Sequence, residues 1–583
     1  MLDSITVEVI RHSLLSAADE MARNLCRTSY NTVVYEIHDY EIGIHDRDGA
    51  TVADTPGIAT PGANDYGIQR SIEFLGRDEI REGDVVMINY PYWSSAHTLD
   101  VLVFAPVVAD DEIIGFASCR VHLLDLKQKD VGYVLDSTDM YQEGIFFPAV
   151  KIYERGEIRQ DIFNIITFNS RMPERTVGDL QAQVSAVHTG VVRVLDLVRR
   201  YGKDRLQSAM EQIHEHGERL ARAAVSKLPD GTWTATDFCD SDGITLDELI
   251  PMTVTVTIDG DRMVMDWTAT DVVAAGPVNL PHGATIAACR LVFKALTTPD
   301  SPVCDGNFRN LEILTTPGTL LHATPPMPTF TLWTCFTAPE IITKALAQGM
   351  PDLVPACSGG DVCDVMALGV DPETGEQWLE ATNDAVGFGA HGGGDGEDGI
   401  MHPTEPGCRN NPVEVLENKG PMLIERYGYR QDSGGPGRHR GGVGIERVYR
   451  FLAPANAIVI NYKTKTAPWG IGEGRDAEAN RVIVFPDTDR ERNVGVSNTA
   501  FEAGEAIVNL TGGGGGWGDP FLREPAAVAI DVRLGFVSVE AAQREYGVVV
   551  DASTFAVDQT ATAARRQTAR RQAAHNERGT VSA

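Results

Sequence analysis

Two apolar runs joined by a short acidic turn constrain this chain more than any other stretch. Residues 101–108 and 113–121 have strand length and are rich in β-branched and aromatic side chains, and Asp110-Asp111 lies between them. This pattern predicts an antiparallel hairpin. If Ala109 pairs with Glu112, His122 stands opposite Leu99, and a slip of one residue places it opposite Asp100 instead.

Three potential metal ligands lie at the open end of this hairpin. His97 and Asp100 precede the first strand and His122 follows the second. Because directly opposed Cβ atoms are roughly 5 Å apart, the three side chains can converge. Two imidazoles and a carboxylate suit Zn²⁺, Mn²⁺ or Fe²⁺. The alternative is a metal-free loop, in which His97 and Asp100 hydrogen-bond to each other and His122 is an ordinary strand-end histidine.

Composition narrows the class of protein. The chain has 583 residues, 43% of them hydrophobic, which is enough for two to four domains. A formal charge of −32 argues against nucleic acid or an anionic membrane as the main partner. The nine cysteines contain no Cys-x-x-Cys pair, so we expect a reducing cytoplasm. We expect neither a signal peptide nor a membrane span, because an amphipathic helix begins near Met1 and no apolar run reaches 18 residues.

Hydrophobic periodicity predicts a multi-domain α+β fold with long central helices. The main predicted elements are a helix over 5–26, a strand over 32–46, helices within 175–228, a hairpin over 254–267, and helices over 284–296 and 538–546. We predict four regions: an N-terminal metal-binding α+β region (1–228), a central α/β region with a glycine-rich loop (229–420), a C-terminal β-rich domain (421–559), and a disordered or frayed tail (560–583).

Several other residues could carry chemistry. Glu143 precedes Gly144, so its carboxylate is a candidate base or substrate contact, the alternative being an ordinary turn. The glycine-rich loop over 386–402 lacks a phosphate-loop motif but contains two histidines. Three cysteines without a local signature are possible nucleophiles: Cys335, Cys357 and Cys363.

Four blocks of sequence resemble the hydantoinase B family, which also includes the C-terminal half of oxoprolinases and subunits of caprolactamase and acetone carboxylase. They are Asn89-Tyr90-Pro91-Tyr92 ahead of His97 and Asp100, the run Arg-Val-His-Leu-Leu-Asp at 120–125, and the glycine-rich stretches 432–442 and 512–520. The chain departs from the family pattern at Tyr90, where an aspartate is usual, and at 126–132, where a glycine-rich run is usual. The resemblance covers residues 5–550.

The resemblance implies a set of ligands and a reaction. It implies that Asp39 joins His97, Asp100 and His122 around a divalent metal, with zinc as the leading candidate and manganese or iron as alternatives. On the residues alone, the favoured interpretation is that Asp39 faces solvent on an edge strand. Asp125 would orient a ligand or shuttle protons. The family also has a glycine-rich loop near its active site, which makes His391 and His402 secondary candidates, the favoured alternative being a flexible loop.

The resemblance also implies a partner. A hydantoinase A-like subunit would bind ATP and Mg²⁺ and phosphorylate the substrate, in a heterotetramer or larger assembly. The implied activity is ATP-dependent hydrolysis of a cyclic amide such as a lactam, a hydantoin or an oxoproline-like ring. Two alternatives are a subunit of an ATP-dependent ketone carboxylase of the acetone or acetophenone type, and a non-catalytic scaffold subunit.

Overall fold

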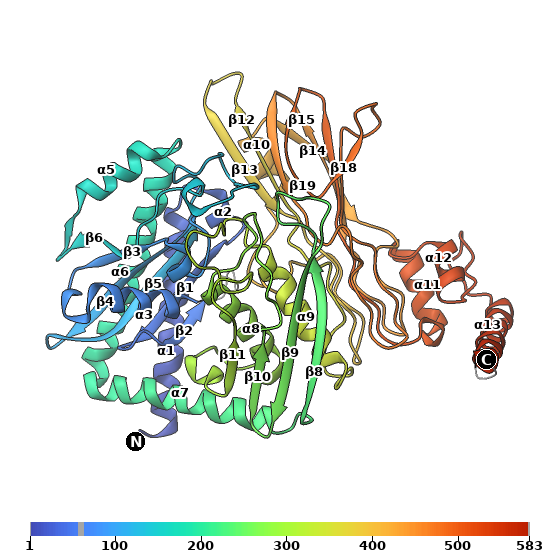
Figure 1. The fold of residues 1–583 in the computed structure, drawn as a ribbon, viewed down its shortest axis with the longest axis horizontal. Helices are drawn as coiled ribbons and strands as arrows, with labels where there is room; N and C mark the ends of the chain where they lie inside the picture. The colour runs from blue at the N-terminus through green and yellow to red at the C-terminus, as the bar shows by residue number, and fades with distance from the viewer. Residues whose placement is uncertain (1, 56–62, 581–583) are drawn as a thin grey trace.

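A computed structural model describes residues 2–55 and 63–580, with side chains as far as Ala569. Its N-terminal part is built on an antiparallel sheet of order β2-β1-β5-β4-β3-β6-β7 (Figure 1). The strands are β1 Tyr40–Asp46, β2 Thr51–Thr55, β3 Val85–Ile88, β4 Asp100–Ala109, β5 Glu112–His122, β6 Val150–Glu154 and β7 Glu157–Ile158.

Long helices cover one face of this sheet. The buried stripe of α1 (Ser4–Thr28), which includes Ile10 and Leu14, packs against α6 (Pro173–Tyr201), and α6 packs on β4 and β5. The predicted helices over 5–26 and within 175–228 are therefore confirmed. The other helices of this part are α2 Thr32–Tyr35, α3 Asn64–Leu75, α4 Pro91–Ser94, α5 Gln160–Asn169 and α7 Lys203–Val225.

The β4–β5 hairpin forms as predicted, and its register contains an irregularity. Ala109 pairs with Glu112 and Val108 with Ile113, but a bulge then shifts the pairing so that Val107 faces Gly115. The shifted register continues to the open end, where Asp100 faces His122. A bulge of one residue thus decides which side chain lies opposite His122.

The predicted strand over 32–46 is wrong in its first half. Residues 32–35 form the short helix α2, and β1 begins only at Tyr40. The Asn31 side chain caps α2 by accepting from the Val33 N–H, and His38 turns the chain with a positive φ of 65°. Asp39 therefore lies in a loop that leads into the sheet.

The central part holds a four-stranded sheet of order β11-β10-β9-β8. Its predicted hairpin and the predicted helix over 284–296 are both confirmed. Helix α9 packs on β8 and β9 and against α8. The elements are β8 Gly231–Cys239, β9 Ile250–Asp259, β10 Arg262–Asp266, α8 His282–Thr297, β11 Leu311–Leu314 and α9 Thr334–Ala347.

Two further sheets, of orders β13-β12-β16-β19 and β14-β15-β20-β17-β18, enclose a separate apolar core in the C-terminal part. Strand β12 precedes residue 420 and pairs with β16, which follows it, while β13 pairs with β12 at the edge of the sheet. The elements are β12 Asp364–Val370, β13 Gln377–Asn383, α10 Val413–Lys419, β14 Met422–Tyr429, β15 Ile445–Phe451, β16 Ala455–Ile460, β17 Arg481–Val484, β18 Arg492–Val494, β19 Val496–Phe501 and β20 Ala506–Leu510.

The glycine-rich segments lie side by side and are joined by backbone hydrogen bonds. The Gly514 N–H donates to the Gly442 carbonyl at 2.9 Å, and the Gly387 N–H donates to the Gly512 carbonyl at 2.9 Å. A Cβ atom added at Gly514 would stand 1.8 Å from the carbonyl oxygen of Phe388. Glycine is required there because neighbouring backbones approach too closely for any side chain.

Three helices follow the sheets and stand at the far edge of the molecule (Figure 1). They are α11 Pro525–Leu534, α12 Val539–Glu545 and α13 Gln559–Thr580. Ser538 caps α12 as predicted, accepting from the Ala541 N–H. Residues 581–583 of the predicted tail lie outside the described residues. No helix in the described ranges is both long and apolar enough to cross a bilayer.

Candidate metal centre

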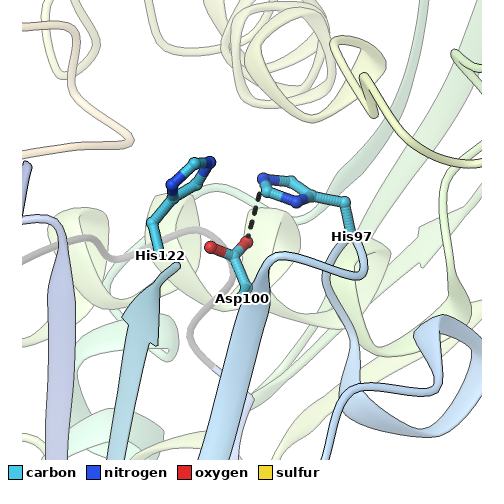
Figure 2. Close-up of side chains that lie close together, drawn as sticks. All are labelled: His97, Asp100 and His122. Atoms are coloured by element: carbon cyan, nitrogen blue, oxygen red, sulfur yellow. Dashed lines mark ion pairs between the residues drawn. The ribbon is translucent and has the colours of Figure 1, made fainter. Parts of the chain in front are cut away.

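His97, Asp100 and His122 meet at the open end of the β4–β5 hairpin. Each offers a ligand atom within 4.8 Å of those of the other two, and all three side chains are buried. The His97 Nε2 atom lies 3.3 Å from the Asp100 Oδ2 atom. Figure 2 shows the three side chains pointing toward one another from the end of β5, the start of β4 and the loop that precedes β4.

Buried amides hold these ligand-bearing segments in place. Asn89 donates from Nδ2 to the carbonyls of Thr98 and Ile145, both at 2.9 Å. Gln183 of α6 donates to the carbonyls of Val101 and Cys119, at 2.7 and 2.9 Å, and so ties the two strands together just below the histidines. These contacts give the Asn89 motif a physical reason: it anchors the loop that carries His97.

The cluster opens into a cavity of about 50 Å³. This volume has room for an ion and a few water molecules. Three more carboxylates, Asp39, Asp364 and Glu405, line the same cavity, and within the described part of the chain no lysine or arginine lines it. The cavity therefore has an excess of negative charge that a cation would offset.

The histidines are neutral at physiological pH. Burial lowers the pKa of His97 to about 3, with a further contribution from the Arg120 guanidinium. Burial also lowers the pKa of His122 to about 4, and the neighbouring His97 adds to this effect. Neutral imidazole is the form that binds a metal, so both rings are prepared as ligands.

The carboxylates of the cavity hold protons more tightly than usual. Burial, followed by repulsion from Asp100, Glu405 and Asp364, raises the pKa of Asp39 well above its ordinary value. Burial and the charge of Glu405 do the same to the pKa of Asp364. Burial raises the pKa of Glu405 to about 7. Repulsion among such groups is relieved by proton uptake or by a bound cation.

Two further observations indicate that His97, Asp100 and His122 fit a divalent metal. Both ring nitrogens of His122 are buried and have no hydrogen-bond partner in the described part of the chain, which is unusual for buried polar atoms. In addition, two ligands at about 2.0–2.1 Å from a tetrahedral zinc ion are about 3.3 Å apart, the separation seen between His97 and Asp100.

Aromatic rings orient the two histidines. Phe330 stacks on His97, with ring centres 5.3 Å apart and planes 27° apart. Tyr133 stacks on His122, with centres 5.8 Å and planes 12° apart. The Tyr133 hydroxyl also lies 3.2 Å from the His97 Nε2 atom. The rings cannot turn away from the cavity without disrupting this packing.

A model of the hydantoinase B/oxoprolinase family matches residues 3–520. The chain belongs to this family. It is 32% identical to the B component of a putative D-/L-hydantoinase from a Pseudomonas species, over 94% of this chain and 95% of that protein. It is 30% identical to the beta subunit of caprolactamase from Pseudomonas jessenii, over 97% of this chain and 99% of that protein.

Solved structures agree with this membership of the hydantoinase B/oxoprolinase family. The crystal structure of the ATP-dependent caprolactamase from Pseudomonas jessenii matches with a TM-score of 0.89 at 29% identity, over 97% of this chain and 100% of that chain. A nucleotide-free acetone carboxylase matches with a TM-score of 0.90 at 18% identity, over 98% of this chain and 84% of that chain, which shows a shared fold.

Asp125 does not line the cavity. Its buried carboxylate is held by Arg171, whose Nη2 donates to Oδ1 at 2.6 Å and whose backbone N–H also donates to it. It fastens the loop after β5 to the start of α6. This placement gives the predicted role in orienting a ligand or shuttling protons no support from geometry.

The secondary candidates also lie outside the cavity wall. His391 is exposed, whereas His402 is buried and its Nδ1 atom lies 2.8 Å from the Thr404 hydroxyl. Burial raises the pKa of all three candidate thiols well above the ordinary value, so they are protonated and poor nucleophiles. They are Cys335, Cys357 and Cys363.

Sequence reasoning missed Tyr133, Asp364 and Glu405. Asp364 begins β12, and Glu405 follows the glycine-rich loop, so both are more than 240 residues from the hairpin. No local spacing connects them to it. The usable signal was modest: a carboxylate at the start of an apolar strand, at position 364, marks a strand end where sites often lie.

Glu405 should make metal-free protein less stable as pH rises from 4.5 to about 7, whereas the lowered pKa values of His97 and His122 favour the folded state as pH rises towards 6.5. Glu405 has an ordinary pKa of 4.5 and a folded-state pKa of about 7, so between these values the folded state holds a proton that the unfolded state has lost. This one group accounts for a fall of roughly 3 kcal/mol at most. Urea unfolding of metal-free wild type and of a Glu405 variant at pH 5 and pH 8 isolates this contribution, because both proteins keep the two histidines.

Glu405→Gln is the matched control for this pH dependence, because it removes the titrating group and keeps the shape. From pH 5 to pH 8 the wild type should lose up to roughly 3 kcal/mol of unfolding free energy relative to this variant. Added Zn²⁺ should stabilise the wild-type protein more at pH 8 than at pH 5. The same pH dependence in variant and wild type would show that Glu405 does not titrate in this range.

Proposed function

We propose that this chain is the metal-dependent catalytic subunit of an ATP-dependent cyclic-amide hydrolase. One observation carries the proposal: two neutral histidines and an aspartate converge on a carboxylate-rich cavity, and one of these histidines has no other partner for its buried nitrogens in the described ranges. Relatives named as a hydantoinase component and a caprolactamase component support cyclic amides as the substrate class.

Asp39, His97, Asp100 and His122 would hold the metal, with zinc as the leading candidate. When bound, such an ion supplies Lewis-acid activation of water near neutral pH. Glu405, with a pKa of about 7 at the cavity wall, is suited to take up and return a proton at its carboxylate. Tyr133 and Phe330 would keep the two imidazoles in orientation.

The proposal includes a partner subunit. An unstrained amide is a poor electrophile, and phosphorylation of its oxygen would make ring opening practicable. The sequence has no phosphate-loop motif, and both of these relatives are named as one subunit of a larger enzyme. We therefore assign ATP and Mg²⁺ to a hydantoinase A-like subunit that phosphorylates the substrate and passes it to this chain.

The test is an activity assay of the chain alone and of the chain co-purified with its partner. The isolated chain should not turn over ATP. With the partner, ATP consumption and ring opening should be coupled for at least one member of a panel of lactams, hydantoins and 5-oxoproline. Vigorous ATP hydrolysis by the isolated chain would overturn the division of labour, and carboxylation of a ketone in place of ring opening would overturn the reaction.

A further inference from the structure

Glu143 lies at the junction of three segments around the candidate metal centre. Its side chain is completely buried, yet it does not line the cavity. Building on the proposed function, we propose that Glu143 is a positioning residue that clamps residues 329–333 over the metal centre.

The carboxylate of Glu143 is saturated with donors. Its Oε1 atom accepts from the Ser137 hydroxyl at 2.7 Å, from the Thr329 N–H at 2.8 Å and from the Phe330 N–H at 3.0 Å. Its Oε2 atom lies 3.3 Å from the Thr329 hydroxyl. Two consecutive backbone N–H groups on one oxygen fix the course of the main chain at Thr329 and Phe330.

The backbone of Glu143 connects this clamp to the ligand loop. The Thr98 hydroxyl donates to the Glu143 carbonyl at 2.5 Å, and Thr98 is adjacent to His97. The next residue, Gly144, has a φ of 123°, and a Cβ there would stand 2.8 Å from the Leu126 carbonyl oxygen. Glycine at 144 therefore lets Glu143 approach both segments at once.

The clamped segment carries part of the cavity wall. Phe330 stacks on His97, and the next three residues, Thr331, Leu332 and Trp333, line the cavity. Leu332 has a positive φ of 37°, a strained conformation for a leucine that surrounding contacts must hold in place. The Trp333 indole donates to Asp361 at 2.6 Å, which fixes the far end of the segment.

Because Glu143 lies outside the cavity and its oxygens are already bonded, the geometry does not support the base or substrate contact that its sequence context suggested. Burial raises the pKa of Glu143 to about 8, so the neutral acid predominates at pH 7. Glutamine has the same shape as that acid. Its amide oxygen can accept the three bonds made by Oε1, and its NH₂ group can donate to the Thr329 hydroxyl.

The test compares Glu143→Gln with Glu143→Ala, using two readouts. The first is zinc affinity by chelator competition without substrate, which does not depend on the reaction proposed above. The second is kcat and KM for ring opening with the partner. Glu143→Gln should keep zinc affinity and kcat within about threefold of wild type, with an unchanged pH profile. Glu143→Ala should weaken zinc binding by about 10–100-fold and lower kcat by about 100-fold.

If Glu143→Gln is as inactive as Glu143→Ala, the positioning role is wrong and Glu143 transfers a proton. If Glu143→Ala keeps the zinc affinity and the kcat of wild type, Glu143 has no positioning role at the metal centre. Thr98→Val serves if Glu143→Ala does not fold, because it removes only the hydroxyl that bonds to Glu143. We expect about tenfold weaker zinc binding in Thr98→Val. Unchanged zinc binding would show that the contact between Thr98 and Glu143 does not position His97.

Discussion

Protein carrying His122→Ala should purify folded but without metal, and it should not open a cyclic amide. The ring nitrogens of His122 make no hydrogen bond within the described part of the chain, so its removal leaves no protein group without a partner. Loss of a ligand should weaken metal binding more than loss of a supporting contact does, hence by more than about 100-fold. Elemental analysis of variant and wild type, with urea unfolding as the check on folding, measures both effects.

His391→Ala is the control for this experiment. His391 is exposed and does not line the cavity, so this variant should keep its metal and its activity. His97→Ala should behave like His122→Ala, since both rings face the same point (Figure 2). Metal at wild-type stoichiometry in His122→Ala would exclude His122 from the ligand set.

Gly514→Ala is expected to prevent folding of the C-terminal part. The added Cβ would stand 1.8 Å from the Phe388 carbonyl oxygen and 2.4 Å from the Gly389 nitrogen, and both atoms belong to backbone that cannot move aside. An overlap of this size exceeds the usual 1–3 kcal/mol of overpacking, and we expect a loss of more than about 4 kcal/mol. Soluble yield and the free energy of unfolding in urea measure it.

Gly428→Ala is the matched control for Gly514→Ala. Gly428 lies in β14, and nothing stands within 4 Å of a Cβ built there. Its replacement should change the free energy of unfolding by less than about 1 kcal/mol. Wild-type stability in Gly514→Ala would mean that the glycine-rich segments are not packed backbone against backbone.

Local sequence patterns were sufficient to predict much of the secondary structure of the N-terminal part. Periods of about 3.6 residues predicted the long helices, and two apolar runs with a two-residue turn predicted the β4–β5 hairpin. Because His97, Asp100 and His122 lie within 26 residues on one hairpin, their meeting could also be predicted. The spacing left two registers open, and a bulge at Val107 and Val108 selected the one that opposes Asp100 and His122.

The sequence by itself determined the hairpin, the long helices and the three converging side chains, since short-range spacing controls all of these. Only the tertiary structure decided which distant groups complete the cavity. Asp364 and Glu405 reach it through long-range packing of the C-terminal part, and Asp39 reaches it because Asn31 caps a short helix where we predicted strand. The need for glycine in the glycine-rich segments also follows only from the tertiary structure, because the backbones that exclude a side chain there come from distant parts of the sequence.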